Sequence, residues 1–191
     1  MTTPEETSPP LDPVELTTPR LHLRPYTLED APTLERLAGV REVAATTLSI
    51  PHPYPPGGGA EWIGRHEAAR REGRGLPFAV IERATGDLVG GIGLTVNAAH
   101  ARAELGYWIA VPRWGEGFAT EAGVAVVDHG FRTLGLHRID AHHMTGNPAS
   151  GRVLAKLGMR PEGTLRGHIL KWGSFEDIAL WGIMRAEWES G

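Results

Sequence analysis

The stretch that decides the fold is PRWGEGFATEA, residues 112–122. A β-rich run over 102–111 ends directly before it, and Pro112 turns the chain. Two glycines, Gly115 and Gly117, are then followed by good helix formers. The pattern predicts a strand, a glycine loop and a long helix over about 117–134 in direct succession.

A junction of this kind can bind an anion. The first N–H groups of a helix have no partner within the helix and carry the positive end of its dipole, so phosphate oxygens can replace those partners. Gly115 and Gly117 would let the backbone approach a ligand closely, although a lone Gly-x-Gly also occurs in plain turns. A P-loop is excluded because no Gly-Lys-Ser/Thr follows, and a dinucleotide fingerprint fails at Thr120.

Length and composition limit the remaining classes of protein. A chain of 191 residues with 41% hydrophobic content supports one sizeable core and one domain. It has no cysteine, which excludes disulfides, thiolate catalysis and cysteine-zinc sites. The formal charge of -4 argues against a broad nucleic-acid-binding face, and no apolar run approaches the roughly 20 residues that span a bilayer. The N-terminus lacks the features of a signal peptide, so we expect a cytoplasmic protein with no nucleic-acid or membrane partner.

The chain divides into a leader and one domain. Residues 1–18 are rich in Pro, Thr and Glu without periodicity and are expected to form a mobile leader, followed by a single domain over 19–191. Periodicity and turn signals predict a strand around 21–24, a helix after 27–30, a loop over 51–59, a helix over 60–73, strands over 77–83, 88–96 and 102–111, the helix over 117–134, a strand over 137–145, a helix from 147 to 158, and strands near 159–170 and 175–185. This order implies an α/β (α+β mixed) fold with helices on both faces of a mixed sheet.

Several motifs resemble the GNAT superfamily of acetyl-CoA-dependent N-acetyltransferases, and especially its Rim-type branch, which acetylates ribosomal-protein N-termini. Residues 114–122 (WGEGFATEA) look like that branch's pyrophosphate loop, and 147–150 (NPAS) with 156–159 (KLGM) looks like its second motif. The superfamily's loop pattern, Gln/Arg-x-x-Gly-x-Gly/Ala, is filled here by Trp114, Gly117 and Ala119, and Trp114 departs from it. The resemblance covers about residues 16–189.

The resemblance implies a GNAT-type fold, with a mixed, mostly antiparallel central sheet in which the strands at 102–111 and 137–145 splay apart. It implies acetyl-CoA (coenzyme A) as co-substrate, with the pyrophosphate on the helix start and the pantetheine arm along the splayed strand. The residues that it assigns to coenzyme A are Ile109, Ala110, Val111, Trp114, Gly115, Glu116, Gly117, Phe118, Ala119, Thr120, Asn147 and Ser150. Ordinary helix capping would explain Asn147 and Ser150 equally well.

The resemblance also implies candidates for catalysis. Glu104 is expected to take the proton of the amine, directly or through a water, and His142 is the second candidate for this base. Many superfamily members have a tyrosine where this chain has Leu154, so Ser150 is expected to donate a proton to the leaving thiolate. A backbone N–H at residue 109 or 110 would stabilise the oxyanion.

Three functions remain open from the sequence. The first is acetyl transfer to a peptide α-amine, such as a ribosomal-protein N-terminus. The second uses a small-molecule amine, such as a polyamine, an amino acid or an antibiotic, in a pocket lined by 51–59, 60–73 and the final hairpin. The third is a non-catalytic coenzyme-A-binding module. The sequence does not decide between a monomer and a homodimer, and no metal site is expected because the pair His142-His143 lacks a third ligand at metal spacing.

Overall fold

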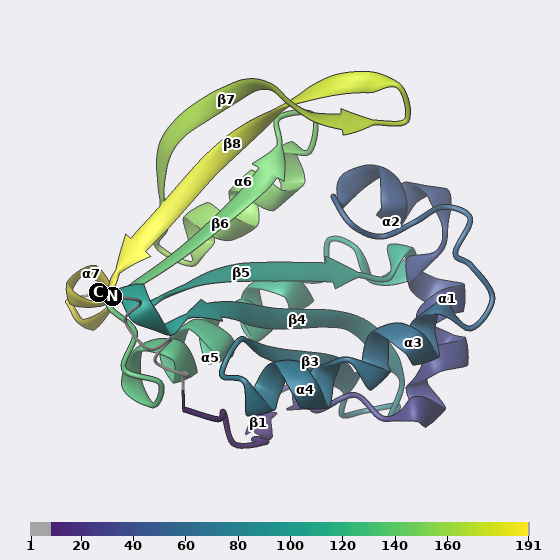
Figure 1. Ribbon diagram of the computed structural model, residues 1–191, viewed down its shortest axis with the longest axis horizontal. Coiled ribbons are helices and arrows are strands. Elements are labelled where there is room, and N and C mark those ends of the chain that lie inside the picture. Colours follow the sequence, from purple (N-terminus) through teal and green to yellow (C-terminus); the bar gives the residue numbers. More distant parts are fainter. Residues whose placement is uncertain (1–8, 191) are drawn as a thin grey trace, which may run out of the picture.

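The computed structural model describes residues 9–190, which form one sheet of eight strands flanked by helices (Figure 1). The strands are β1 (Leu16–Thr17), β2 (Leu21–Arg24), β3 (Gly75–Glu82), β4 (Leu88–Asn97), β5 (Arg102–Ile109), β6 (Arg138–Met144), β7 (Arg160–Lys171) and β8 (Ser174–Met184). Their spatial order is β1-β2-β3-β4-β5-β6-β8-β7, and every neighbouring pair is antiparallel except β5 with β6. The predicted mixed, mostly antiparallel sheet is confirmed.

Helices cover both faces of this sheet, as predicted. In Figure 1, α3 and α4 lie in front of the strands and α5 lies behind them. The α-helices are α1 (Ala31–Ala38), α2 (Arg41–Thr46), α3 (Gly58–Gly64), α4 (His66–Arg71), α5 (Phe118–Arg132), α6 (Pro148–Lys156) and α7 (Arg185–Glu189), and the 3-10 turns are η1 (Leu28–Asp30), η2 (Ala98–His100) and η3 (Val111–Arg113). Within residues 9–190, no helix is long and apolar enough to cross a membrane.

Alternation along β3 assigns its side chains to two cores. Phe78 and Val80 are fully buried in the larger core, which includes side chains of α5 and α6. Ala79 and Ile81 point to the other face, where they pack with side chains of α1 and α3, including Leu34. Because successive side chains of a strand alternate between faces, a run that is apolar throughout can hold helices on both sides of the sheet.

The parallel pair of β5 and β6 is the irregular point of the sheet. The two strands pair only over residues 102–104 and 138–140. Beyond these positions β5 remains paired with β4, and β6 remains paired with β8, as far as Ile109 and Met144. The strands therefore diverge toward their carboxyl ends, as Figure 1 shows, and the predicted splayed pair is confirmed. We call the region between the diverging halves the split.

Part of the predicted leader belongs to the fold. Residues 1–8 of that leader lie outside the described residues, but Leu16–Thr17 pairs with β2 as the edge strand. The side chain of Leu11 packs against the larger core, and its carbonyl accepts a hydrogen bond from the Arg70 guanidinium at 2.6 Å. The predicted boundary at residue 19 is therefore wrong. The segment from Leu11 to Thr17 is held by contacts with residues that are distant in the sequence. Such contacts leave no local periodic pattern in the sequence.

The helices before β3 also differ from the prediction. The predicted helix over 60–73 is two helices, α3 and α4, and α3 begins at Gly58, inside the predicted loop over 51–59. Glu35 of α1 accepts a hydrogen bond from the Gly59 N–H at 2.8 Å, so another helix stabilises a helix start that the glycines disfavour. The short helices α2 and α7 were not predicted, because six and five residues are too few to show a periodic pattern.

Candidate active site

The glycine loop leads from β5 into α5 through two left-handed residues. Gly115 and Gly117 have φ angles of 83° and 84°, which side chains larger than glycine's rarely allow. Gly117 is the N-cap of the 15-residue α5, and no side chain of the described residues caps this helix start. A Cβ added to Gly115 would meet no atom of residues 9–190 within 4 Å. The loop is therefore open at Gly115, and the Arg20 guanidinium lies beside Gly117, an arrangement that fits the predicted anion site.

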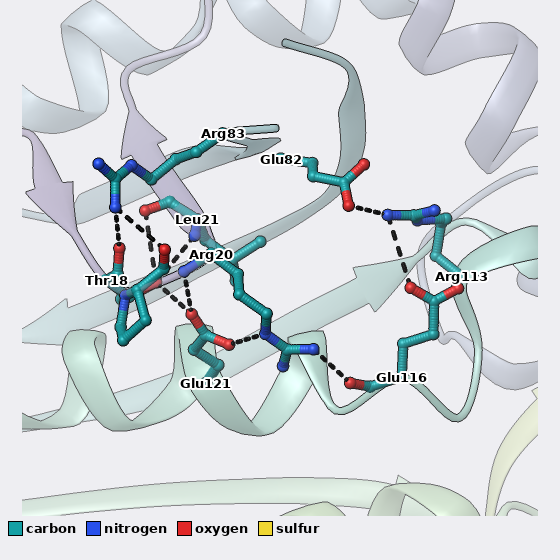
Figure 2. A network of polar contacts seen from close by, with 9 residues as sticks. Thr18, Arg20, Leu21, Glu82, Arg83, Arg113, Glu116 and Glu121 are labelled. Carbon is teal, nitrogen blue, oxygen red and sulfur yellow. Dashed lines mark hydrogen bonds and ion pairs between the residues drawn. The ribbon is translucent and has the colours of Figure 1, made fainter. Parts of the chain in front are cut away.

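A cluster of hydrogen bonds holds this loop against the start of the sheet (Figure 2). The Arg20 side chain donates from Nε to Glu121 Oε2 at 2.6 Å and from Nη1 to the Glu116 carbonyl at 2.9 Å. Glu121 Oε1 also accepts from Thr18 Oγ1 at 2.6 Å and from the Arg20 backbone N–H at 2.8 Å. Burial alone would raise the pKa of Glu121, but these hydrogen bonds outweigh it and lower the pKa of the carboxyl. Residues 18–20 thus fix the first turn of α5.

Two guanidinium groups pack on one buried ring beside the loop. The Phe118 ring centre lies 4.7 Å from Arg20 Cζ and 4.9 Å from Arg113 Cζ, and Phe118 is only 2% exposed. Arg113 also pairs with Glu82 and lies 3.5 Å from the Glu116 carboxylate (Figure 2). Because the Phe118 side chain belongs to the core, a ligand at this position can meet only the backbone of Phe118.

The end of β5 offers fewer free backbone groups than expected. The Ala110 N–H donates to the Val89 carbonyl at 2.9 Å, so it cannot serve as the oxyanion donor. The Ile109 carbonyl accepts from Trp114 Nε1 at 2.7 Å, which gives Trp114 a structural role as well. In an antiparallel pair the backbone groups of successive residues point to opposite sides. Since Ala110 bonds toward β4, the Ile109 N–H points toward the split and is the group left for a ligand.

Glu104 and His142 meet where the split begins. Glu104 is the last residue of β5 that pairs with β6, and its side chain is 49% exposed. His142 Nδ1, on β6, lies 3.4 Å from Glu104 Oε1, so the structure brings the two candidate bases together. The neighbouring His143 is buried instead, and its ring nitrogens contact the Met144 carbonyl at 2.8 Å and Trp181 Nε1 at 3.1 Å. His143 is therefore a core histidine.

The start of α6 carries the other predicted residues. Asn147 is its N-cap, and Asn147 Oδ1 accepts a hydrogen bond from the Ser150 N–H at 3.3 Å. Asn147 Nδ2 also donates to the Thr46 carbonyl at 3.3 Å. The capping role of Asn147 is confirmed, and its contact with coenzyme A stays a prediction. Leu154 is fully buried in the larger core.

Tyr107 is a residue of this region that the sequence analysis missed. Its Oη lies 2.7 Å from Ser150 Oγ and 3.3 Å from the Ser150 carbonyl oxygen. Burial raises the pKa of Tyr107 to about 12, although the hydrogen bond with Ser150 opposes this effect. The phenol is therefore neutral at physiological pH. Alternation along β5 could have placed Tyr107 on the same face as Leu105, but no sequence signal showed that α6 lies against that face.

The candidate groups approach the split from both faces of the sheet. Tyr107 packs with the larger core on the side of α5 and α6, as does Leu105. Trp108 packs with the smaller core on the side of α1 and α3, and Glu104 shares its parity along the strand. A substrate that passed through the split would therefore meet Glu104 from one face and Ser150 from the other.

This combination of a splayed sheet and a glycine loop at a helix start defines a class of acetyl-transferring enzymes. The model of the acetyltransferase (GNAT) domain matches residues 20–160, and the chain belongs to this family. It is an N-acetyltransferase, and the acyl donor of its family is acetyl-CoA.

Individual relatives agree with this assignment. The chain is 40% identical over 119 residues to the uncharacterized N-acetyltransferase YoaA of Bacillus subtilis, over 62% of this chain and 67% of that protein. It is 29% identical over 142 residues to the ribosomal protein uS5-alanine N-acetyltransferase of Escherichia coli, over 73% of each. Among solved structures, Mycobacterium smegmatis RimJ in complex with CoA-disulfide matches with a TM-score of 0.78 and 30% identity, over 87% of this chain and 83% of that chain.

Replacing Glu121 by glutamine should lower the free energy of unfolding by roughly 1–3 kcal/mol at pH 7, because hydrogen bonds to a charged acceptor are lost. The pKa of Glu121 is lower in the folded state than in the unfolded state, where it is about 4.3. The carboxylate therefore contributes its full share of the free energy of unfolding above about pH 4.3, and this share is lost as the pH falls through the folded-state pKa. Urea titrations should show the wild type and E121Q converging in acid. Glu61→Gln, in an exposed pair with Arg65, is the control and should change little. A constant difference at every pH would contradict the assignment.

Replacing Gly117 by valine should abolish stabilisation by acetyl-CoA. A side chain at φ 84° is strained, and relief of that strain would reorient the first N–H groups of α5. Wild type with acetyl-CoA at 100 times its Kd should gain about 2.7 kcal/mol, measured as a rise in Tm. Gly86→Val is the matched control, because Gly86 has a φ of 77° and lies in the β3–β4 turn. If G117V keeps the same rise in Tm as G86V, the loop does not bind the donor.

Proposed function

We propose that the acetyl acceptor is the α-amino group of a protein N-terminus, such as that of a ribosomal protein. The observation that carries this proposal is the pairing of Glu104 with His142 at the opening of the split. An α-amine has a pKa of about 7.7–8.0, whereas that of a lysine amine is about 10.4, so only the α-amine is partly neutral near pH 7. A half-exposed carboxylate beside an imidazole is a sufficient base for such an amine. The relative named as a ribosomal protein uS5-alanine N-acetyltransferase supports the same acceptor class.

In this proposal acetyl-CoA supplies the acetyl group as an activated thioester. The backbone N–H groups of residues 115–120 hold its pyrophosphate, and Asn147 and Ser150 contact pantetheine from the side of α6. The Ile109 N–H faces the reacting carbonyl and stabilises the negative charge that develops on its oxygen. Trp114 keeps the Ile109 peptide in place through its bond to the carbonyl. In this proposal one catalytic domain contains residues 19–191 and also the preceding segment from Leu11 to β1, which packs against it.

Glu104 takes the proton of the amine in this mechanism. Its carboxylate lies on the face of the sheet opposite to α6, so the amine approaches from that face. His142 contacts Glu104 at 3.4 Å and can share the proton or pass it to water. The two groups form one proton-accepting unit, in which Glu104 is the proposed base.

Ser150 donates a hydrogen bond to the sulfur as it leaves. Tyr107 has a single hydroxyl proton, and donating it to Ser150 Oγ leaves the serine proton directed outward. Because its pKa is raised to about 12, Tyr107 acts as a neutral hydrogen-bond donor that orients Ser150. Tyr107, on β5, thus supports the step that a tyrosine at position 154, on α6, would have served.

A panel of acceptors tests the proposed class directly. A short peptide with a free α-amine should gain one acetyl group by mass spectrometry in the presence of acetyl-CoA. The same peptide with a blocked N-terminus and one free lysine should react on the order of a hundredfold more slowly at pH 7, because far less of its amine is neutral. Polyamines should react as slowly as lysine. Faster acetylation of a polyamine than of every peptide would overturn the proposal in favour of a small-molecule acceptor.

Two sets of variants separate the base from the hydrogen-bond donors. Glu104→Gln should lower kcat about a hundredfold at pH 7, and the activity should recover as the pH rises and the amine loses its proton unaided.

Tyr107→Phe should lower kcat roughly twofold to tenfold, the effect of one hydrogen bond, with an unchanged pH profile and an unchanged KM for acetyl-CoA. Ser150→Ala should lower kcat across the range and also raise that KM. If His142→Ala shows the alkaline recovery and Glu104→Gln does not, the base is His142.

A further inference from the structure

The tip of the β7–β8 hairpin carries a large aromatic residue in an unfavourable backbone conformation. Lys171 pairs with Ser174, so the loop consists of Trp172 and Gly173 alone. Their φ angles are 47° and 86°, as a type I′ turn requires, and such turns favour Asn-Gly or Gly-Gly. Within residues 9–190, Ala101 is the only other non-glycine residue with positive φ. Strain of this kind persists where another interaction compensates for it, often at a functional site.

Two positive charges surround the Trp172 ring. The Arg41 Cζ atom of α2 lies 4.8 Å from the ring centre, and the Lys171 Nζ atom lies 5.0 Å from it. Trp172 remains 49% exposed, so the ring and both cations face a surface that a ligand can reach. Both cations therefore contact the same aromatic ring, which favours a positive charge at each position.

Neither cation is neutralised by the described part of the chain. Lys171 Nζ donates to the Thr47 carbonyl at 2.7 Å, and burial lowers its pKa. No carboxylate of residues 9–190 lies within 4.0 Å of the charged nitrogens of Arg41 or Lys171. The pair can therefore interact with an anion from outside the described residues.

The cations line a cavity of about 370 Å³ beside the candidate active site. Its wall combines α2, the hairpin tip and the end of β6, and includes Met144, Gly146 and Asn147. Asn147 also caps α6, three residues before Ser150, so the cavity adjoins the region proposed for the thioester. Glu176 is the only carboxylate among the lining residues, and the two cations outnumber it. The cavity therefore favours an anionic group over a polycation.

We infer that this cavity is an acceptor subsite that selects peptides with a carboxylate in the first residues after the reactive amine. The inference rests on the proposed function, since the amine of such a peptide enters the split while its carboxylate lies between Arg41 and Lys171. Trp172 positions both cations and forms one wall of the subsite. The same charges disfavour polyamines, which agrees with a peptide acceptor.

Calorimetric binding tests the subsite separately from catalysis. Two N-terminally acetylated peptides, identical except for Asp or Asn at positions 2–4, are titrated into the full chain with coenzyme A present. The Asp peptide should bind roughly threefold to tenfold more tightly, and the difference should shrink at high salt. Arg41→Glu should abolish or reverse this preference, whereas Arg132→Gln, at the far end of α5, should preserve it. Equal binding of both peptides by the wild type would overturn the subsite.

A second comparison tests the role of Trp172. Trp172→Gly removes the backbone strain together with the aromatic wall, so the variant should fold with a Tm close to that of the wild type and lose the preference for the Asp peptide. Ala101→Gly relieves the same kind of strain in the turn before β5 and should keep the preference. Retention of the preference in W172G would exclude Trp172 from the subsite.

The unblocked peptides distinguish the two proposals. If the Asp peptide binds selectively but no peptide is acetylated, the subsite stands and the proposed acceptor class is wrong. If peptides are acetylated with equal kcat/KM for Asp and Asn, the acceptor class stands and the subsite is wrong. A free amino acid as the best substrate would show that the carboxylate is recognised in a small molecule, and would overturn the peptide form of the inference.

Discussion

The candidate site depends on the separation of β5 from β6 after three pairs of residues. A continuous sheet would use the backbone groups of both strands in mutual hydrogen bonds. Here each strand keeps only its outer neighbour, and β5 turns one edge toward the split. An edge of this kind is normally a liability, because it invites pairing with another chain. In this protein the edge supplies backbone groups that can pair with a linear ligand. The pantetheine arm of coenzyme A is a ligand of this shape.

Side-chain and backbone hydrogen bonds lower the free-energy cost of this open edge. The Trp114 indole satisfies the Ile109 carbonyl, and the Ala110 N–H is satisfied by β4. Tyr107, which is half-buried beside the split, shares a hydrogen bond with Ser150. Buried polar groups without partners are strongly destabilising, so these contacts make the open edge compatible with a stable fold. They also leave the Ile109 N–H, at the end of β5, directed toward the split, which suits stabilisation of a developing negative charge.

The cations near the glycine loop and those near the hairpin tip have different kinds of partner. Around the glycine loop, Arg20 and Arg113 are paired with Glu121, Glu82 and Glu116, so they hold the loop and leave its backbone to bind an anion. Around the hairpin tip, Arg41 and Lys171 have an aromatic ring and a carbonyl as partners instead of carboxylates. The first arrangement contributes to stability and the second leaves charge for recognition. This difference in role follows from the partners that the fold gives to each cation, because nothing in the sequence around the four residues distinguishes them.

The sequence by itself determined the features that depend on neighbouring residues. The order of strand, glycine loop and helix around residues 112–122 could be predicted, because proline, glycine and helix propensities act locally. The sheet class and its helices on both faces followed from the same local periodicities, and motif resemblance indicated the splayed pair. Only the tertiary structure decided the rest. It joined Tyr107 to Ser150 across 43 residues, bound Arg20 to Glu121 across 101 residues, and placed α2 beside the hairpin tip. These contacts arise when the whole chain packs, and side chains so far apart in the sequence leave no periodic signal of their meeting.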